Sequence, residues 1–239
     1  MNINEFSDRF DTLLNSYLAG TPFGFQDNGV TIKLDEYEKS LFLTQAHLEV
    51  VTGLYSGSLG ASFEKVEQTR RYLAPYLRKN VKEFDNHDTH YSKYHAYDVS
   101  LPEDCMFIVL EQAVINDETC LSGNIINVTP ALMDELNSLL ENPFRGITDK
   151  RVLRIDNSNG VTLYSKYALG EYTMTYIKKP SPIILVDLQG TPLSIEGLQT
   201  VNECEAVPEL HQMILDKAVL NAIQTRFNQS VNNNNAEKH

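Results

Sequence analysis

Residues 142–185 read NPFRGITDKRVLRIDNSNGVTLYSKYALGEYTMTYIKKPSPIIL, and they contain three segments with the character of β-strands. These segments are 151–155, 161–167 and 171–178. The first two are joined by Asn157-Ser158-Asn159-Gly160, a composition that tolerates positive φ and favours a hairpin. The third alternates Tyr, Met and Tyr with Thr, as a strand with one buried face does. Pro180 and Pro182 then lack backbone donors and predict the end of sheet pairing.

Upstream residues predict further strands of an antiparallel sheet. The hydrophobic period approaches two in three segments: Tyr97–Leu101, Met106–Ile115 and Leu121–Val128. Thr129-Pro130 then has the composition of an N-cap followed by proline at the first helical position. We therefore expect one helix, 130–141, inserted among the strands and ended by Asn142-Pro143.

The first 80 residues are predicted to be mainly helical. Apolar residues at helical spacing indicate a first helix that ends at Gly20: Phe6, Phe10, Leu13, Leu14 and Tyr17. After an extended piece at Val30–Leu34, Asp35 and Glu38 have the spacing of a capping box. The helix that follows is expected to bury Tyr37, Leu41, Ala46 or Leu48, Val51 and Tyr55. A third helix is predicted to start at Ser62 and to kink or end at Pro75.

The polar segment from Lys79 to Lys93 is predicted to be an exposed loop between the helices and the strands. Pro208 opens a C-terminal helix through about Phe227, and Asn232–Asn235 predict a disordered tail. The expected fold is therefore α+β, with N-terminal helices, an antiparallel β-sheet or sandwich and a C-terminal helix. The expected regions are 1–80 (helical), 81–190 (β-rich) and 191–239 (linker, helix and tail).

Composition excludes some classes of function. The chain has 239 residues with 20 Lys plus Arg against 32 Asp plus Glu, a formal charge of -12. That balance argues against a surface that grips phosphates and fits a wall that DNA slides past. The three cysteines are widely spaced, so no disulfide framework or zinc knuckle is expected. No apolar run approaches the roughly 20 residues that cross a bilayer, so we expect a cytosolic origin and no membrane partner.

Candidate catalytic and binding chemistry is sparse. The loop with Asp85, His87, Asp88 and His90, followed by His95, contains metal-ligand residue types, but their spacing favours a solvated loop. Neither a nucleophile elbow nor a phosphate-binding glycine loop occurs. The carboxylates Glu36 and Glu38, and Glu203 and Glu205, are interpreted as solvated. We expect no catalytic residue, no metal and no cofactor.

Two further residues are interpreted as structural. His211 lies in the first turn of the last helix, where a charged imidazole would oppose the macrodipole, so a neutral surface or interface histidine is expected. Cys105 precedes an apolar run and is interpreted as a core residue.

Several phrases of the sequence, in this order, resemble a virion structural protein of crAss-like bacteriophages. They are DEYEKSLFLTQA (35–46), FE (63–64) with RRYL (70–73), PFRG (143–146) with RVLR (151–154), YIKKPSPIIL (176–185) and PELH (208–211). The resemblance implies a ring subunit of a short-tailed phage neck, of the head-to-tail connector type. Such a homo-oligomer, with an expected twelvefold symmetry, would stack under the portal protein against adjoining rings and let phage DNA pass without specific binding.

This reading places the protein in the virion after synthesis in the host bacterial cytoplasm. The sheet region, Tyr94–Val186, is expected to form the ring wall, and the helices to contact adjoining rings. Candidate interface residues are Arg70, Arg71, Phe144, Arg145, Tyr172, Tyr176 and Leu210. The alternatives are a non-ring virion or assembly protein, a metal-dependent phage enzyme using His87 and His90, and a nucleic-acid-binding factor with clustered basic residues.

Overall fold

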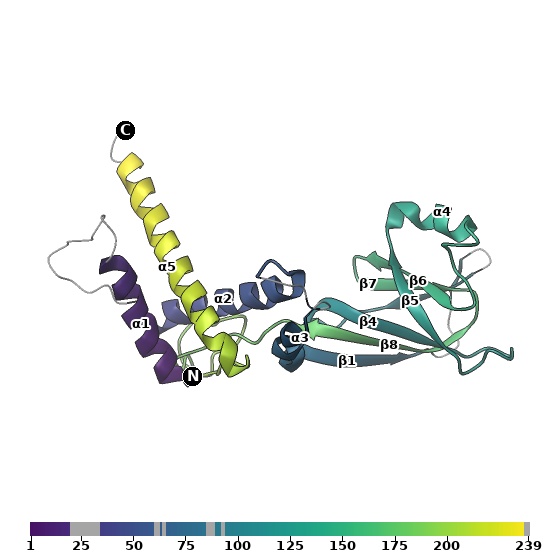
Figure 1. Ribbon diagram of the computed structural model, residues 1–239, viewed down its shortest axis with the longest axis horizontal. Helices are drawn as coiled ribbons and strands as arrows, with labels where there is room; N and C mark the ends of the chain where they lie inside the picture. The colour runs from purple at the N-terminus through teal and green to yellow at the C-terminus, as the bar shows by residue number, and fades with distance from the viewer. Residues whose placement is uncertain (20–33, 60–62, 64–65, 85–88, 92–93, 237–239) are drawn as a thin grey trace. The chain divides into compact units, whose positions relative to one another are not determined.

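The computed structural model describes residues 1–19, 34–59, 63, 66–84, 89–91 and 94–236. It divides the chain into two compact units, shown in Figure 1. Unit 1 combines Met1–Pro75 with Pro180–His239, and unit 2 is the intervening segment Tyr76–Lys179. Unit 1 is therefore assembled from the two ends of the chain, whereas unit 2 is continuous.

Three helices form the frame of unit 1: α1 (Ile3–Ala19), α2 (Glu36–Ser56) and α5 (Pro208–Ala236). The predicted capping box is confirmed, because Asp35 Oδ1 accepts from the backbone N–H of Glu38 at 2.7 Å and the Glu38 side chain accepts from the backbone N–H of Asp35 at 3.3 Å. Gly57, at φ 82°, ends the helix in the left-handed conformation.

The buried face of α2 agrees only in part with the predicted one, since Ala46 and Val51 are buried as expected. Leu41 is 42% exposed, whereas Ser40 and His47 are fully buried. Ser40 is buried because it binds the extended segment that follows unit 2: its Oγ accepts from the backbone N–H of Leu185 at 2.9 Å. Thr44 Oγ1 accepts from the N–H of Ile183 in the same way, at 3.0 Å. An apolar pattern cannot reveal a helix face that binds backbone through hydroxyls.

Other helix boundaries were predicted in part. The third helix is the short α3 (Glu67–Leu73), which passes into a 3-10 turn, η1 (Ala74–Tyr76), at Pro75 as expected. Three predicted features lie outside the described residues: the helix start at Ser62, the helix end at Gly20, and residues 30–33 of the extended piece. The backbone of α5 continues through Asn232–Asn235 instead of ending near Phe227, because asparagine costs only a few tenths of a kcal/mol in a helix that is already formed.

Unit 2 is a curled sheet, and its described residues form eight strands in the order β1-β8-β4-β5-β6-β7-β3-β2. The strands are β1 (Leu77–Glu83), β2 (Thr89–Tyr91), β3 (Tyr94–Val99), β4 (Cys105–Ile115), β5 (Ile125–Ala131), β6 (Arg151–Asn157), β7 (Gly160–Ser165) and β8 (Leu169–Lys178). The α+β class is confirmed. The sheet is mixed, however, because β5 and β6 pair in parallel.

The predicted hairpin is confirmed at β6–β7, where Asn157 pairs with Gly160 across a two-residue turn. Positive φ occurs there at Gly160 alone, at 148°. A Cβ on Gly160 would lie 2.1 Å from the carbonyl oxygen of Val99, so glycine is required by a close approach of backbone. The alternation predicted for 171–178 is also confirmed, with Tyr172, Met174 and Tyr176 buried in β8.

Two predictions in this unit are wrong. Residues 79–83 form part of β1 instead of a loop, because an edge strand whose side chains face solvent on both sides shows no apolar alternation. Thr129-Pro130 lies inside β5, where it pairs with Leu153-Arg154. The inserted helix starts later, with a 3-10 turn, η2 (Met133–Glu135), followed by α4 (Leu136–Glu141).

The core of unit 2 lies on the inner face of the curled sheet. Its buried members come from β3 to β8: Tyr97, Val99, Ala113, Ile115, Ile126, Val128, Val152, Val161, Leu163, Leu169, Tyr172, Met174 and Tyr176. Phe84, which follows β1, packs its ring 4.5 Å from that of Tyr97 in β3. Tyr97 Oη also accepts from the N–H of Leu169 at 3.0 Å. These contacts join strands near opposite ends of the strand order and hold the sheet in its curl.

Candidate assembly surface

The connection between β5 and β6 leaves the sheet of unit 2 as a separate lobe. Parallel neighbours cannot be joined by a tight hairpin, so the chain must leave the sheet after Ala131 and return at Arg151. Residues 132–150, called the crossover lobe below, contain η2 and α4 and project from the sheet (Figure 1). The lobe therefore follows directly from the parallel pairing.

A small apolar cluster fastens the lobe to the sheet. Tyr94, Ile147 and Leu153 are buried in this cluster, and the partly buried Leu139 and Leu140 of α4 pack against them. Tyr94 Oη also donates to the backbone carbonyl of Leu140 at 2.9 Å. These contacts use one side of α4 and leave its other side exposed.

The turn Asn142–Gly146 is held by its own hydrogen bonds. Asn142 Oδ1 accepts from the N–H groups of Phe144 and Arg145 at 2.9 and 3.0 Å. Arg151 Nη1 donates to the carbonyl of Arg145 at 3.0 Å. A Cβ on Gly146 would lie 2.0 Å from the carbonyl oxygen of Leu139, so any larger residue would displace the turn. The backbone that carries Phe144 is therefore fixed in place.

The lobe presents three large apolar side chains to solvent. Phe144 is 87% exposed, Met133 is 65% exposed and Leu132 is 64% exposed. Single exposed apolar residues are ordinary, but three on one short, anchored segment are typical of a surface that binds another protein. Aromatic and methionine side chains are also enriched in the centres of protein interfaces.

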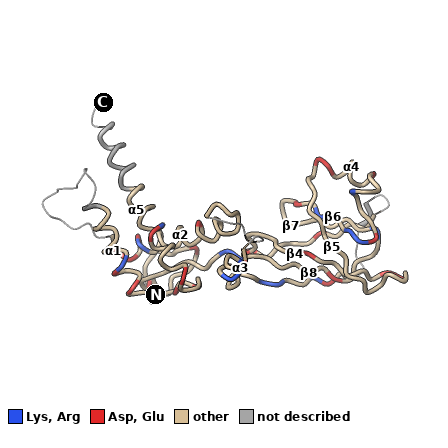
Figure 2. Tube along the Cα trace, in the orientation of Figure 1, with Lys and Arg blue, Asp and Glu red and all other residues tan. Residues whose placement is uncertain are grey.

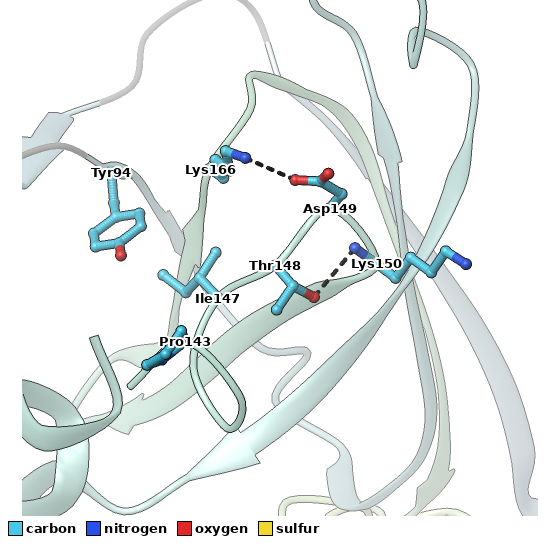
Figure 3. Close-up of a pocket in the computed structure, with 7 residues that line it drawn as sticks. All are labelled: Tyr94, Pro143, Ile147, Thr148, Asp149, Lys150 and Lys166. Atoms are coloured by element: carbon cyan, nitrogen blue, oxygen red, sulfur yellow. Dashed lines mark hydrogen bonds and ion pairs between the residues drawn. The ribbon is translucent and has the colours of Figure 1, made fainter. Parts of the chain in front are cut away.

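A shallow pocket of about 590 Å³ lies beside the lobe, as Figure 3 shows. Lys166 Nζ forms an ion pair with Asp149 Oδ1 at 2.8 Å, and Tyr167 Oη donates to the same oxygen at 2.9 Å. The hydrogen bonds from Lys166 and Tyr167 lower the pKa of Asp149, and the Asp149 carboxylate raises the pKa of Lys166. A carboxylate paired in this way stays ionised and is poorly suited to general acid or base chemistry.

The structure separates the candidate interface residues into exposed and buried ones. Phe144 and Arg145 are adjacent and exposed on the lobe, and Arg70 and Arg71 are exposed on α3, where Arg71 pairs with Glu67 at 2.7 Å. The remaining three are buried within the chain itself: Tyr172 at 1%, Tyr176 at 6% and Leu210 at 1% exposure. Within unit 2, Phe144 and Arg145 therefore lie together on the exposed surface of the lobe. Leu132 and Met133 were not among the candidate interface residues, because residues 130–141 were expected to form one helix among the strands.

Tyr172 belongs to a buried polar network on the inner face of the sheet. Its Oη donates to Glu111 Oε1, and Arg154 Nη1 pairs with Glu111 Oε2 at 2.7 Å. Burial raises the pKa of Glu111, although Tyr172 and Arg154 oppose this effect. Burial and the Glu111 carboxylate likewise raise the pKa of the Tyr172 hydroxyl. No pattern in the sequence predicted the network of Tyr172, Glu111 and Arg154.

Burial also raises the pKa of Cys105, which packs against this core as predicted.

The predicted metal-type residues are placed only in part. Asp85, His87 and Asp88 lie outside the described residues, and of His90 only the backbone is described, paired with His95 between β2 and β3. Within the described residues, no group of three His, Cys, Asp or Glu side chains could hold a metal ion. In the same part of the chain, no helix combines the length and apolar character that crossing a membrane requires.

Comparison with known proteins relates this architecture to one family. The sequence profile of the phage tail ring protein 3/4 family of crAss-like phages matches residues 1–235. The chain belongs to the phage tail ring protein 3/4 family. The resemblance seen in the sequence phrases is thereby confirmed.

Two relatives of this chain come from Bacteroides phage crAss001. "Ring protein 3" is 43% identical over 235 residues, which cover 93% of this chain and 95% of the relative. "Ring protein 4/5" is 27% identical over 233 residues, which cover 92% of this chain and 91% of the relative. Both relatives are named for rings and neither name includes a reaction.

Proposed function

We propose that this protein is a structural subunit of a ring in the phage virion, located in the neck or tail. The observation that carries the proposal is the match of residues 1–235 to a family of tail ring proteins. The anchored lobe with exposed Phe144 supports it, since a ring subunit must bind its neighbours through a surface that the isolated chain leaves open. No catalytic role is proposed.

Several finer features belong to the same proposal. The ring has twelve copies, stacks near the portal protein against adjoining rings, and encloses a channel through which DNA passes during ejection. The sheet region Tyr94–Val186 forms its wall, and the N-terminal and C-terminal helices contact neighbouring rings. The acidic balance, a formal charge of -12, supports a lumen that does not retain DNA. The protein is made in the host bacterial cytoplasm and then incorporated into particles.

The test is electron microscopy of the purified chain with mass photometry of the same sample. We expect two-dimensional class averages with annuli, and a mass distribution with a species near twelve copies. The variant Phe144→Gln is expected to shift that distribution toward monomer. Leu41→Gln, at a residue of α2 that is 42% exposed, is the matched control and is expected to leave it unchanged.

A strictly monomeric wild-type chain, at every concentration and absent from virions, would contradict the ring. Annuli of another copy number would contradict the twelvefold symmetry alone. Annuli that form equally well with Phe144→Gln would exclude Phe144 from the contact between subunits.

A further inference from the structure

The edge strand β1 carries a concentration of positive charge that the rest of this acidic chain does not predict. Its seven residues include Arg78, Lys79 and Lys82, all exposed, with Glu83 as the single acid. Val81, between the lysines, is 46% exposed. Within the described residues, β1 pairs with β8 on one side and with no strand on the other. Side chains alternate along a strand, so Lys79 lies on the same face as Val81, whereas Arg78 and Lys82 lie on the other face. The edge therefore offers basic side chains on both faces and an apolar residue beside Lys79.

The helical part of the crossover lobe has the opposite character. Residues Leu132–Glu141 contain Asp134, Glu135 and Glu141 and no lysine or arginine. All three acids are exposed, beside the exposed Leu132 and Met133. The two surfaces are also similar in length, at roughly 15 Å for the ten residues of the lobe and about 20 Å for the seven residues of the strand.

The two surfaces do not meet within one chain. Strands β8 and β4 lie between β1 and β5, the strand from which the lobe departs. In unit 2, Figure 1 shows α4 at the upper side and β1 along the lower side. Figure 2 shows the acidic residues before α4 in red and the basic residues of β1 in blue. Their complementarity is therefore available only to a second copy.

We infer that the crossover lobe of one subunit docks on the β1 edge of the next, with Val81 against Met133 and the charges paired around them. This inference rests on the proposed ring and names its lateral contact. Two different surfaces of one chain make a heterologous interface, which closes into a ring when the rotation between copies allows it. Charge complementarity also fixes the register and disfavours lobe-to-lobe contact.

The main competing occupant of β1 is DNA, since three basic side chains on an exposed strand could bind phosphates. The charge of -12 disfavours this use, as does the presence of an acidic partner surface on the same chain. The experiment below gives the two occupants different results.

The test uses charge reversals in the full chain, with self-association measured by analytical ultracentrifugation at about 0.1 M salt. The edge variant is K79E/K82E, the lobe variant is D134K/E135K, and the control is E103K/E118K at exposed acids elsewhere in unit 2. We expect each of the first two to weaken self-association at least about tenfold, because like charges then face each other. The combined four-residue variant is expected to recover to within about threefold of wild type, and the control to match wild type.

A cysteine pair provides a second measurement that does not depend on charge. The variant V81C/M133C is expected to form a ladder of disulfide-linked oligomers on mild oxidation. Either single cysteine variant is expected to give no ladder beyond the background set by the exposed Cys120.

Recovery in the combined variant together with the ladder would support the contact. Rings that tolerate both reversals, or a combined variant that does not recover, would overturn the contact and leave the ring proposal intact. An edge variant that assembles normally but loses salt-dependent retention on duplex DNA would overturn it in favour of DNA. A wild-type chain that never associates and is absent from virions would overturn the ring itself.

Discussion

Each unit buries a cation, and the two units stabilise that cation in different ways. In unit 1, Lys39 is 2% exposed and its Nζ reaches Asp11 at 2.8 Å and Glu36 at 3.0 Å. Both carboxylates keep contact with water, at 29% and 41% exposure. In unit 2, Arg154 is 11% exposed and its partner Glu111 only 6%. Arg154 Nε also lies 3.1 Å from the exposed Asp156. The difference therefore lies in the carboxylates: both partners of Lys39 keep contact with water, whereas Glu111 does not.

The pKa directions agree with this difference. Burial lowers the pKa of Lys39, but the hydrogen bonds and charges of Asp11 and Glu36 outweigh burial and leave that pKa raised. For Glu111, burial prevails over Tyr172 and Arg154, and the pKa is raised away from the ionised form. The charged state is thus favoured at Lys39 and disfavoured at Glu111. Removing a partner should therefore cost more in unit 2 than in unit 1.

The largest effect is expected for Arg154→Met, which leaves the Glu111 carboxylate buried without its cation. The free energy of unfolding should fall by about 3–5 kcal/mol at pH 7, measured by urea denaturation. The double variant R154M/E111Q, which removes both charges, is expected to recover most of that loss. A single variant as stable as wild type would mean that Glu111 is hydrated or already protonated, and the comparison would fail.

Tyr172→Phe is expected to have the next largest effect, because it removes the hydroxyl that donates to Glu111 Oε1. A hydrogen bond to a charged group contributes about 1.5–3 kcal/mol, and the variant should lose a similar amount of stability. Tyr176→Phe is a useful comparison, since its hydroxyl donates to the exposed Asp104 at 3.0 Å and should matter less. Equal losses for the two variants would contradict the special burial of Glu111.

Lys39→Met should cost less than either change at Glu111, about 1–2 kcal/mol, because Asp11 and Glu36 can regain water when the ammonium is removed. Methionine keeps the apolar stem that α2 buries. The measurement is the same urea denaturation, compared with Lys217→Met, which breaks an exposed pair with Glu49 at 3.2 Å. A loss as large as that of Arg154→Met would show that carboxylate exposure does not decide the cost.

The smallest expected effect concerns the pH dependence of unit 1. His211 is buried, its Nε2 lies 2.9 Å from the Ala206 carbonyl and its Nδ1 lies 2.6 Å from the Met1 amine. Burial lowers its pKa from the usual 6.5; the Met1 ammonium adds to this, whereas Ala206, Glu5 and Glu209 oppose it. The neutral form therefore supports folding.

The sign of the pH effect follows from that lowered pKa. The stabilisation is fully present above pH 6.5 and is lost as the pH falls below 6.5 through the folded-state pKa. The difference in unfolding free energy between wild type and His211→Gln, measured from pH 8 to pH 5, should shrink toward low pH. A difference that grows toward low pH would show a charged imidazole in the fold.

Local signals in the sequence predicted a large part of the fold. The capping box at Asp35, the hairpin closed by Gly160 and the half-buried alternation of β8 each depend on neighbouring residues, so their physics is visible in the chain. The end of α3 near Pro75 was also predicted, because proline acts on its own stretch of backbone. His211 was expected to be a neutral histidine at the surface or at an interface. Its lowered pKa agrees with the neutral form, and its side chain is buried within the chain.

The features that escaped prediction depend on distant partners. The parallel pairing joins β5 and β6 across the whole crossover lobe, residues 132–150, and Thr129, which has the composition of an N-cap, lies inside β5. Lys39 and Ser40 are buried because other segments supply their hydrogen-bond partners. Phe144 was named as an interface residue through resemblance to a family, since no periodicity tells an exposed aromatic from a buried one.

The division of unit 1 between the two ends of the chain has a consequence during synthesis. The ribosome releases α1 and α2 first, then the whole of Tyr76–Lys179, and only afterwards the segment and helix that cover them. The curled sheet can fold before Ile183 and Leu185, whose backbone N–H groups bind α2, have been synthesised. Truncated nascent chains should thus acquire protease resistance first in Tyr76–Lys179, and the helical unit should become resistant only after α5 has left the ribosome.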